Sequence, residues 1–221
     1  MLNRLWRKKD HRPSARKERE RLACEYARHG KTRLHIGCGP RVLKDWLNID
    51  LEYCHYKDYL KYYTDRFYPE AVRGTEEDFY AMDVTAAPFP LPDESVDLVF
   101  HEDFIEHLTE KEQIMFFAET CRVMKKGAVH RVNTPNLFVS MRDHADMRKG
   151  FAGIYFDEWD RHGHKNVLTP KILEELAFMT GYAKVIFTGR DGSAAKDVPP
   201  EYRPDPADRP EEGNIFADLI K

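Results

Sequence analysis

The sequence predicts an α/β fold in which a mostly parallel, doubly wound sheet is covered by helices on both faces. From residue 33 onward, short apolar runs of strand length alternate with amphipathic runs at helical spacing, which is typical of a parallel sheet. The last apolar run follows a long loop with no helix, so we expect this strand to be antiparallel. With 221 residues the chain can bury one substantial core, which favours one main domain.

Seven apolar runs define the expected strands: 34–36, 46–49, 80–82, 95–100, 128–132, 183–188 and 215–220. Helices are expected over 110–124 and 169–180. The second of these has Thr169 as its N-cap, Pro170 at its first position and Gly181 after its end, which is the usual asymmetry of helix termini.

Two segments depart from this alternation. Residues 52–81 form a tyrosine-rich insertion, and a helix is expected in it because aromatic residues recur at helical spacing: Tyr59, Tyr62, Tyr63 and Phe67. Residues 189–213 carry many charges and five prolines (199, 200, 204, 206 and 210), so an exposed loop is expected before the last strand.

Residues 1–31 are expected to form a basic helical arm, and residues 32–221 the main domain. The arm holds 11 Lys or Arg against 4 Asp or Glu, although the whole chain has a formal net charge of -3. A glycine after His29 would end its helix. Such a helix can contact nucleic acid, an anionic membrane or an acidic partner, while a solvated arm or a lid is the simpler interpretation.

Composition excludes several classes of protein. No apolar run approaches the 18 or so residues of a membrane span, and no secretory leader is visible, so we expect a cytoplasmic protein without an integral membrane segment. The four cysteines lack CxxC or zinc-like spacing and are expected to be reduced: Cys24, Cys38, Cys54 and Cys121.

The ends of the first four strands carry glycine or polar residues, and ligands of doubly wound sheets bind beyond these ends. The turn Gly37-Cys38-Gly39 allows close approach of a ligand. Asp50 can accept hydrogen bonds from both ribose hydroxyls of an adenosine, and Asp83 from its adenine amino group. A third glycine is absent, which disfavours an NAD(P) site.

Several segments in order resemble the class I S-adenosylmethionine-dependent methyltransferases, of the type 11 kind found with polysaccharide-biosynthesis genes. HIGCGP resembles motif I, NIDL the acidic end of strand two, and FIEHL the start of the helix after strand four. The stretches DVTAAPFPLPDESVDLVF, RVMKKGAVHRVNTPN and GHKNVLTPKILEELAFMTGY resemble later segments, so the resemblance covers roughly residues 33–221.

The resemblance implies a Rossmann-like, three-layer α/β/α fold with a seven-stranded sheet, S-adenosyl-L-methionine as cofactor, and a small-molecule or glycan-linked acceptor methylated at oxygen. It implies these cofactor-binding residues: His35, Gly37, Cys38, Gly39, Asp50, Leu51, Met82, Asp83, Val84, His101 and Glu102.

Two departures from the family pattern keep an alternative open. His35 stands where motif I usually has an acid, and Ala128 replaces a glycine. A catalytically silent scaffold with this fold is therefore a second hypothesis. A nucleic-acid methyltransferase is disfavoured, because the body of the chain is acidic and no NPPY-like or DPPY-like tetrapeptide follows strand four. The sequence does not determine the oligomeric state.

His107 is the candidate general base for a hydroxyl acceptor, because an imidazole titrates near neutral pH. Local packing at a helix start is its alternative role. His101 is expected near the sulfonium or the acceptor. No metal site is expected, because the acids and histidines of HEDFIEH and DRHGH do not repeat at ligand spacing. Four residues either line an acceptor pocket or belong to a solvated polar loop, and the sequence favours neither: Arg161, His162, His164 and Lys165.

Overall fold

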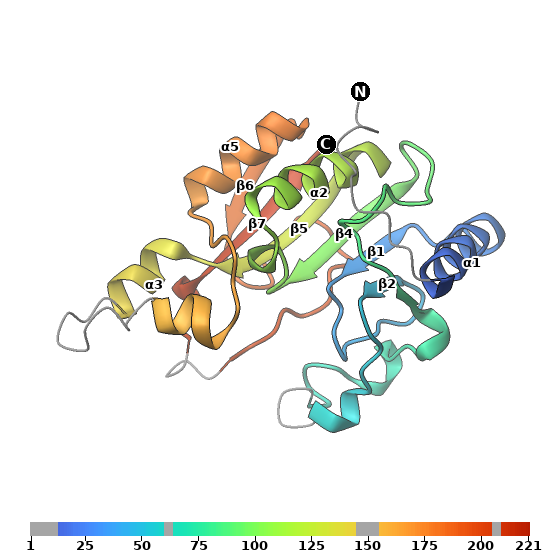
Figure 1. Cartoon of the computed structure of the whole chain (residues 1–221), viewed down its shortest axis with the longest axis horizontal. Coiled ribbons are helices and arrows are strands. Elements are labelled where there is room, and N and C mark those ends of the chain that lie inside the picture. The colour runs from blue at the N-terminus through green and yellow to red at the C-terminus, as the bar shows by residue number, and fades with distance from the viewer. Residues whose placement is uncertain (1–12, 60–63, 145–154, 205–208) are drawn as a thin grey trace.

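The chain forms one seven-stranded sheet in the computed structural model, which describes residues 13–59, 64–144, 155–204 and 209–221 (Figure 1). The strand order is β3-β2-β1-β4-β5-β7-β6. The strands are β1 Arg33–Ile36, β2 Leu47–Asp50, β3 Phe79–Ala81, β4 Val96–Glu102, β5 Met124–Pro135, β6 Lys184–Thr188 and β7 Asn214–Ile220. β7 runs antiparallel to both of its neighbours, and the other pairs are parallel, which confirms the predicted sheet.

The order of the strands reverses between β1 and β4. The chain runs outward from β1 through β2 to β3 and then returns to place β4 on the other side of β1. Leu34 of β1 pairs with Val99 of β4 in the same direction. The carboxyl ends of these two strands therefore meet at a topological switch point, which is where doubly wound sheets bind ligands.

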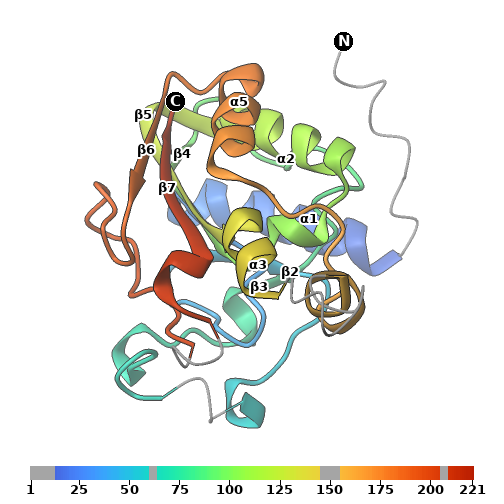
Figure 2. The same ribbon diagram turned by 90° about the vertical axis from the view of Figure 1, so that its left-hand side faces the viewer.

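Three helices cover one face of the sheet: α1 (Pro13–His29), α2 (Glu110–Val123) and α5 (Pro170–Thr180) (Figures 1 and 2). Leu22 of α1, Phe116 of α2 and Leu173 of α5 belong to one hydrophobic core with the strand residues Leu34 and Val99. The capping box at Thr109 begins α2, and Gly181 with φ +108° ends α5. Two elements were not predicted, the helix α3 (Leu137–His144) and a π-helical segment at Tyr155–Arg161.

α1 packs on the sheet and is not a solvated arm. Its Leu22 is fully buried, and the Arg21 guanidinium lies 4.2 Å from the centroid of the Tyr80 ring. Gly30, with φ +63°, follows the helix at the predicted place. Residues 1–12 of the predicted arm lie outside the described residues. Among the helices described, none is both long and apolar enough to cross a membrane.

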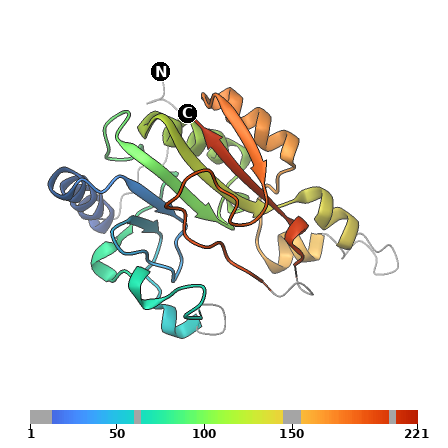
Figure 3. The same ribbon diagram turned by 180° about the vertical axis from the view of Figure 1, so that it is seen from behind.

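The opposite face of the sheet is covered by short 3₁₀ helices and loops (Figure 3). A second core cluster forms there from six residues: Leu43, Trp46, Phe67, Tyr68, Leu98 and Phe100. The helix expected through Tyr59 and Phe67 lies partly outside the described residues, and its described ends are a 3₁₀ helix at Tyr56–Tyr59 and a turn. The tyrosine-rich segment therefore contributes aromatic rings to the core without a long helix.

The proline-rich loop is largely exposed, as predicted, but a buried ion pair binds it to this face of the sheet. Arg131 of β5 donates from Nε to Glu201 Oε1 at 2.9 Å and from Nη2 to Glu201 Oε2 at 2.7 Å. Its Nη1 donates to Asp218 Oδ1 of β7 at 3.3 Å. All three side chains have no exposed surface. Burial raises the pKa of Glu201, and Arg131 opposes this shift.

We expect Arg131→Ala to lower the free energy of unfolding by about 3–5 kcal/mol, because it leaves Glu201 and Asp218 buried without their cation. Urea denaturation followed by circular dichroism measures this. Arg16→Ala removes an ion pair whose arginine is 86% exposed and should leave the midpoint unchanged. Equal midpoints for the two variants would contradict a stabilising role of the Arg131 pair.

Candidate functional site

A cavity of about 340 Å³ lies at the carboxyl ends of β1 and β4. It is lined by His35, Gly37, Cys38, Gly39, Pro40, Arg41, Phe67, Glu102, Asp103 and Tyr202. A larger hollow of about 880 Å³ shares Phe67 and Tyr202 with it and extends along the proline-rich loop. The cavity therefore lies at the predicted switch point and opens toward the loops that cover the second face.

The glycine turn after β1 has the conformation that its sequence predicts. Gly37 has φ +61° and Gly39 φ +50°, in the left-handed region that favours glycine. A Cβ on Gly37 would lie 2.5 Å from Cδ2 of Phe104, so this glycine also allows the loop after β4 to approach. A Cβ on Gly39 would meet nothing within 4 Å, so the space beside it is open to a ligand.

Asp50 is held against this turn. Its Oδ2 accepts a hydrogen bond from the Gly39 amide at 2.8 Å, and its Oδ1 accepts one from the Leu51 amide at 2.6 Å. Asp50 is partly buried, whereas the Leu51 side chain is 53% exposed. The short connection from β1 to β2 therefore brings the carboxylate directly beside the glycines, although no helix separates the two strands.

Asp83 follows β3 and accepts hydrogen bonds at Oδ1 from the amide of Thr85 at 2.8 Å and from its hydroxyl at 2.6 Å. The side chains of Met82 and Val84 are buried in the main core. A cofactor could therefore contact these two residues through their main chain, whereas Asp83 keeps part of its side chain accessible.

The structure buries both predicted histidines of β1 and β4. The ring of His35 stacks on Phe100 with centroids 5.1 Å apart, and its Nδ1 lies 3.2 Å from Asn48 Oδ1. Burial, together with Arg41, lowers its pKa to about 3. His101 has no exposed surface and packs against Phe104 and Phe116.

Burial also lowers the pKa of His101 to about 3. Neither of its ring nitrogens has a hydrogen-bond partner within the described part of the chain. An uncharged ring enclosed by phenylalanines is not placed to contact a reacting group, so the structure does not support the predicted catalytic role of His101.

Glu102 is engaged in holding the loop that covers the cavity. Its Oε2 accepts from Arg41 Nη1 at 2.7 Å, and its Oε1 accepts from the Tyr202 amide at 2.6 Å. Arg41 also donates to the Pro200 carbonyl at 2.6 Å and lies 4.1 Å from the centroid of the Phe67 ring. Sequence reasoning missed Arg41 and Tyr202, because their contacts join segments that are far apart in the chain.

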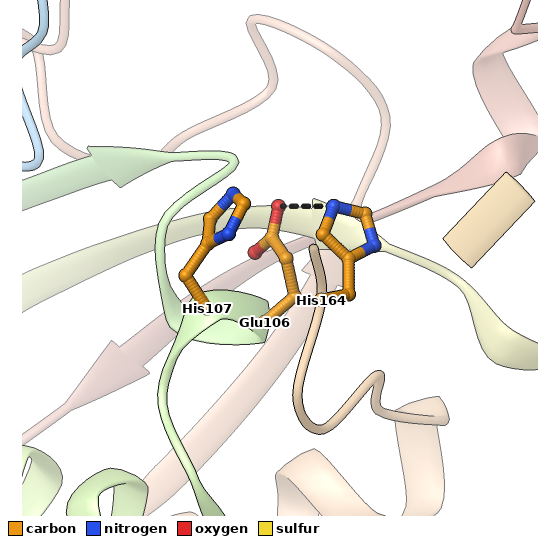
Figure 4. Close-up of side chains that lie close together, drawn as sticks. All are labelled: Glu106, His107 and His164. Atoms are coloured by element: carbon orange, nitrogen blue, oxygen red, sulfur yellow. Dashed lines mark ion pairs between the residues drawn. The ribbon is translucent and has the colours of Figure 1, made fainter. Parts of the chain in front are cut away.

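Three potential ligand side chains gather just beyond β4: Glu106, His107 and His164 (Figure 4). One nitrogen or oxygen of each lies within 4.8 Å of the other two. Glu106 and His107 belong to the 3₁₀ helix Ile105–His107, and His164 belongs to the loop before α5. The segments HEDFIEH and DRHGH are far apart in the sequence, and only the fold brings them together.

Glu106 is fully buried, and burial raises its pKa well above the ordinary value of a carboxyl. Its Oε2 accepts from the Thr134 hydroxyl at 2.9 Å, while its Oε1 has no hydrogen-bond partner among the described residues. His107 is the most exposed of the three, and burial followed by the neighbouring His164 lowers its pKa.

His164 is oriented by a buried carboxylate. Its Nδ1 lies 2.7 Å from Glu158 Oε2, and its Nε2 faces Glu106 Oε1 at 4.0 Å. The other three residues of the predicted acceptor pocket are exposed: Arg161, His162 and Lys165. His164 is therefore the member of this set that the structure joins to the predicted general base, His107.

Comparisons with known proteins agree with this arrangement. Residues 34–132 match the family described as a methyltransferase domain. A protein of Mycolicibacterium smegmatis described as a "probable S-adenosylmethionine-dependent methyltransferase" is 48% identical over 50 residues, which are 23% of this chain and 19% of that protein. The matched segment thus spans about a fifth of the length of this curated relative.

Two solved structures are similar to the chain at low sequence identity, and the first of them illustrates the likeness in fold. A S-adenosylmethionine-dependent methyltransferase from Archaeoglobus fulgidus superposes with a TM-score of 0.51 at 16% identity, over 92% of this chain and 94% of that one. A phosphoethanolamine N-methyltransferase from Haemonchus contortus, in complex with S-adenosylhomocysteine, has a TM-score of 0.46 at 18% identity, over 77% of this chain and 38% of that one.

The family match includes the glycine turn of β1 and the acids that follow β2 and β3, and these are the elements that meet at the switch point. Residues 34–132 therefore match a methyltransferase domain, and the fold of the chain is that of S-adenosylmethionine-dependent methyltransferases.

Proposed function

We propose that the chain transfers the methyl group of S-adenosylmethionine to an oxygen atom of a small-molecule or glycan-linked acceptor. The observation that supports this most is the contact of Asp50 with the glycine turn, a 2.8 Å hydrogen bond from the Gly39 amide at the switch point. This hydrogen bond holds a carboxylate that could bind the ribose directly beside a glycine turn with open space, and a bound adenosine requires both groups to be adjacent.

In this proposal Asp50 binds the ribose hydroxyls and Asp83 the adenine amino group. The side chains of His35 and Glu102 are buried in contacts of their own, with Asn48 and with Arg41 respectively. They therefore shape the cavity and do not bind the cofactor through charge. The methionine part of the cofactor would lie along the open side of Gly39, within the cavity of about 340 Å³.

The acceptor would approach from the side of the Glu106–His107–His164 cluster. During transfer the carbon–sulfur bond of the cofactor breaks, a carbon–oxygen bond forms, and the acceptor hydroxyl loses its proton. His107 is the proposed proton acceptor, because it is the most exposed member of the cluster. Alignment of oxygen, methyl carbon and sulfur supplies much of the acceleration, since the sulfonium is already activated.

A silent scaffold is the second candidate, and the burial of His35 where the family usually has an acid is the observation that favours it. The two candidates differ in cofactor binding, which a scaffold does not require. Binding of S-adenosylmethionine therefore separates them before any acceptor is known.

We predict that the chain binds S-adenosylmethionine and S-adenosylhomocysteine in a saturable manner, and that Asp50→Ala weakens this binding roughly 10–100-fold. Hydrogen bonds to a charged group contribute about 1.5–3 kcal/mol each, and this variant removes the acceptor of the ribose hydroxyls. Isothermal titration calorimetry measures both dissociation constants.

Asp58→Ala is the matched control, because this acid is exposed in the tyrosine-rich segment away from the turn. It should bind both ligands as the unmodified chain does. If neither ligand binds the unmodified chain at millimolar concentration, the enzymatic proposal is wrong and the scaffold is favoured.

We predict that His107→Ala lowers kcat by about 10²–10⁴-fold while the dissociation constant for S-adenosylmethionine stays within twofold, since a group that assists proton removal acts on the acceptor. Methyl transfer from labelled cofactor to hydroxylated acceptors, saccharides included, measures the rate. His29→Ala, at the exposed end of α1, is the control histidine. Unchanged turnover in His107→Ala would remove this residue from the mechanism.

A further inference from the structure

We infer that Glu106, His107 and His164 form a binding site for a divalent transition-metal ion (Figure 4). The three side chains come from two segments that the fold brings together, and they offer one carboxylate oxygen and two imidazole nitrogens within 4.8 Å of one another. The inference rests on four observations: an unpartnered carboxylate oxygen, an oriented imidazole, a rigid support, and the donor set itself.

The first observation is the Oε1 atom of Glu106. The side chain has no exposed surface, and within the described residues this oxygen accepts no hydrogen bond. Thr134 occupies only the other oxygen, Oε2, at 2.9 Å. A buried carboxylate without a positive partner is costly, and a coordinated cation removes that cost.

The second observation is the orientation of His164. A carboxylate only accepts hydrogen bonds, so the 2.7 Å contact with Glu158 Oε2 places the proton of His164 on Nδ1. This leaves a lone pair on Nε2, which faces Glu106 Oε1 at 4.0 Å. That separation is too long for a hydrogen bond. Two ligands with bonds of about 2.0 Å at a tetrahedral angle lie about 3.3 Å apart, so a small rotation of either side chain would bring both atoms to one ion.

A histidine held by a carboxylate through its second nitrogen is the usual support of a metal ligand. Glu158 is itself 5% exposed and accepts a hydrogen bond from the Ser140 hydroxyl of α3. The carboxylate and its own partner are therefore both ordered, and the orientation of the His164 ring does not depend on a ligand.

The third observation is the rigid connection between the two segments. The Glu106 carbonyl accepts hydrogen bonds from the amides of Lys165 at 2.7 Å and Asn166 at 3.1 Å. Gln113 of α2 donates to the carbonyls of Ile105 at 2.7 Å and Asn166 at 2.9 Å. The main chains that carry the ligands are thereby fixed to each other, as an organised site requires.

The fourth observation is the donor set. Two imidazoles and one carboxylate suit Zn²⁺, Co²⁺, Fe²⁺ or Mn²⁺, whereas Mg²⁺ and Ca²⁺ prefer oxygen ligands alone. Three protein ligands leave at least one coordination position, and the more exposed side of the cluster is that of His107. The site is therefore of the open kind, which can bind a further oxygen ligand.

The consequence for catalysis rests on the proposed function. An acceptor hydroxyl in the open position would be acidified by the ion and would lose its proton to water before the methyl group is transferred. His107 would then be a metal ligand and not the proton acceptor. Removal of the metal decides between the two roles, because a general base works without an ion.

The binding test uses the untagged full chain, stripped of metal by dialysis against a chelator, with Zn²⁺ and Co²⁺ as probes. Calorimetry should show one ion per chain, and the visible absorption of Co²⁺ should report nitrogen and oxygen ligands. His164→Ala and Glu106→Gln should each weaken binding by about tenfold or more, and Glu158→Gln by about 10–100-fold through the orientation of His164. The control His29→Ala should bind as the unmodified chain does.

Glu106→Gln also shows whether a loss of metal binding is caused by misfolding. It replaces a buried carboxyl by a neutral amide of the same size, so without metal its thermal midpoint should equal or exceed that of the unmodified chain. Zn²⁺ should raise the midpoint of the unmodified chain alone. Absence of one-to-one binding, or binding that Glu106→Gln and His164→Ala leave unchanged, overturns the metal site.

Failure of the metal site and failure of the proposed function are distinguishable. The metal titration needs neither cofactor nor acceptor, and the Asp50→Ala titration needs no metal. A chain that binds S-adenosylmethionine but no ion keeps the proposed function with His107 as its base. A chain that binds the ion but no cofactor loses the methyltransferase activity and keeps the metal site.

Discussion

Two buried arginines hold the second face of the sheet closed, and the site depends on them. Arg131 binds Glu201 through two hydrogen bonds, and Arg41 binds both Glu102 and the carbonyl of Pro200. No long helix is described on this face, so the proline-rich loop provides the cover and the wall of the cavity. Removing one partner of a buried ion pair strongly destabilises a protein, because the other charge stays buried without its partner. These ion pairs therefore hold the loop in one position on the sheet.

The proline-rich loop, which covers this face, gives other partners to residues that the sequence motifs predict to bind the cofactor. Glu102 ends β4 and was predicted to bind the cofactor, yet its carboxylate accepts from Arg41, from Asn133 and from the Tyr202 amide. His35 is likewise buried, with its ring stacked on Phe100 of the second core cluster. In the proposed function, cofactor recognition falls to Asp50, Asp83 and the main chain of the glycine turn, where Gly37 and Gly39 are only partly buried like the two acids.

The Glu106–His107–His164 cluster differs from these pairs in one physical respect. Arg41 and Arg131 form ion pairs with Glu102 and Glu201, whereas Glu106 is buried with an oxygen that has no hydrogen-bond partner among the described residues. The fold has thus buried a carboxyl group whose hydrogen bonds the described residues do not complete. A metal ion bound to this oxygen would stabilise the buried carboxylate and, in the proposed function, would lie on the side from which the acceptor approaches.

The sequence by itself determined the strands, the antiparallel last strand, the helices α2 and α5, and the place of Gly37, Gly39 and Asp50, because these follow from local periodicity, capping and turn chemistry. Tertiary structure alone decided that α1 packs on the core, that His101 is enclosed, and that the proline-rich loop is anchored through the buried Glu201. It also decided that His164 meets Glu106. Burial and side-chain partners depend on contacts between distant segments, which no local pattern encodes.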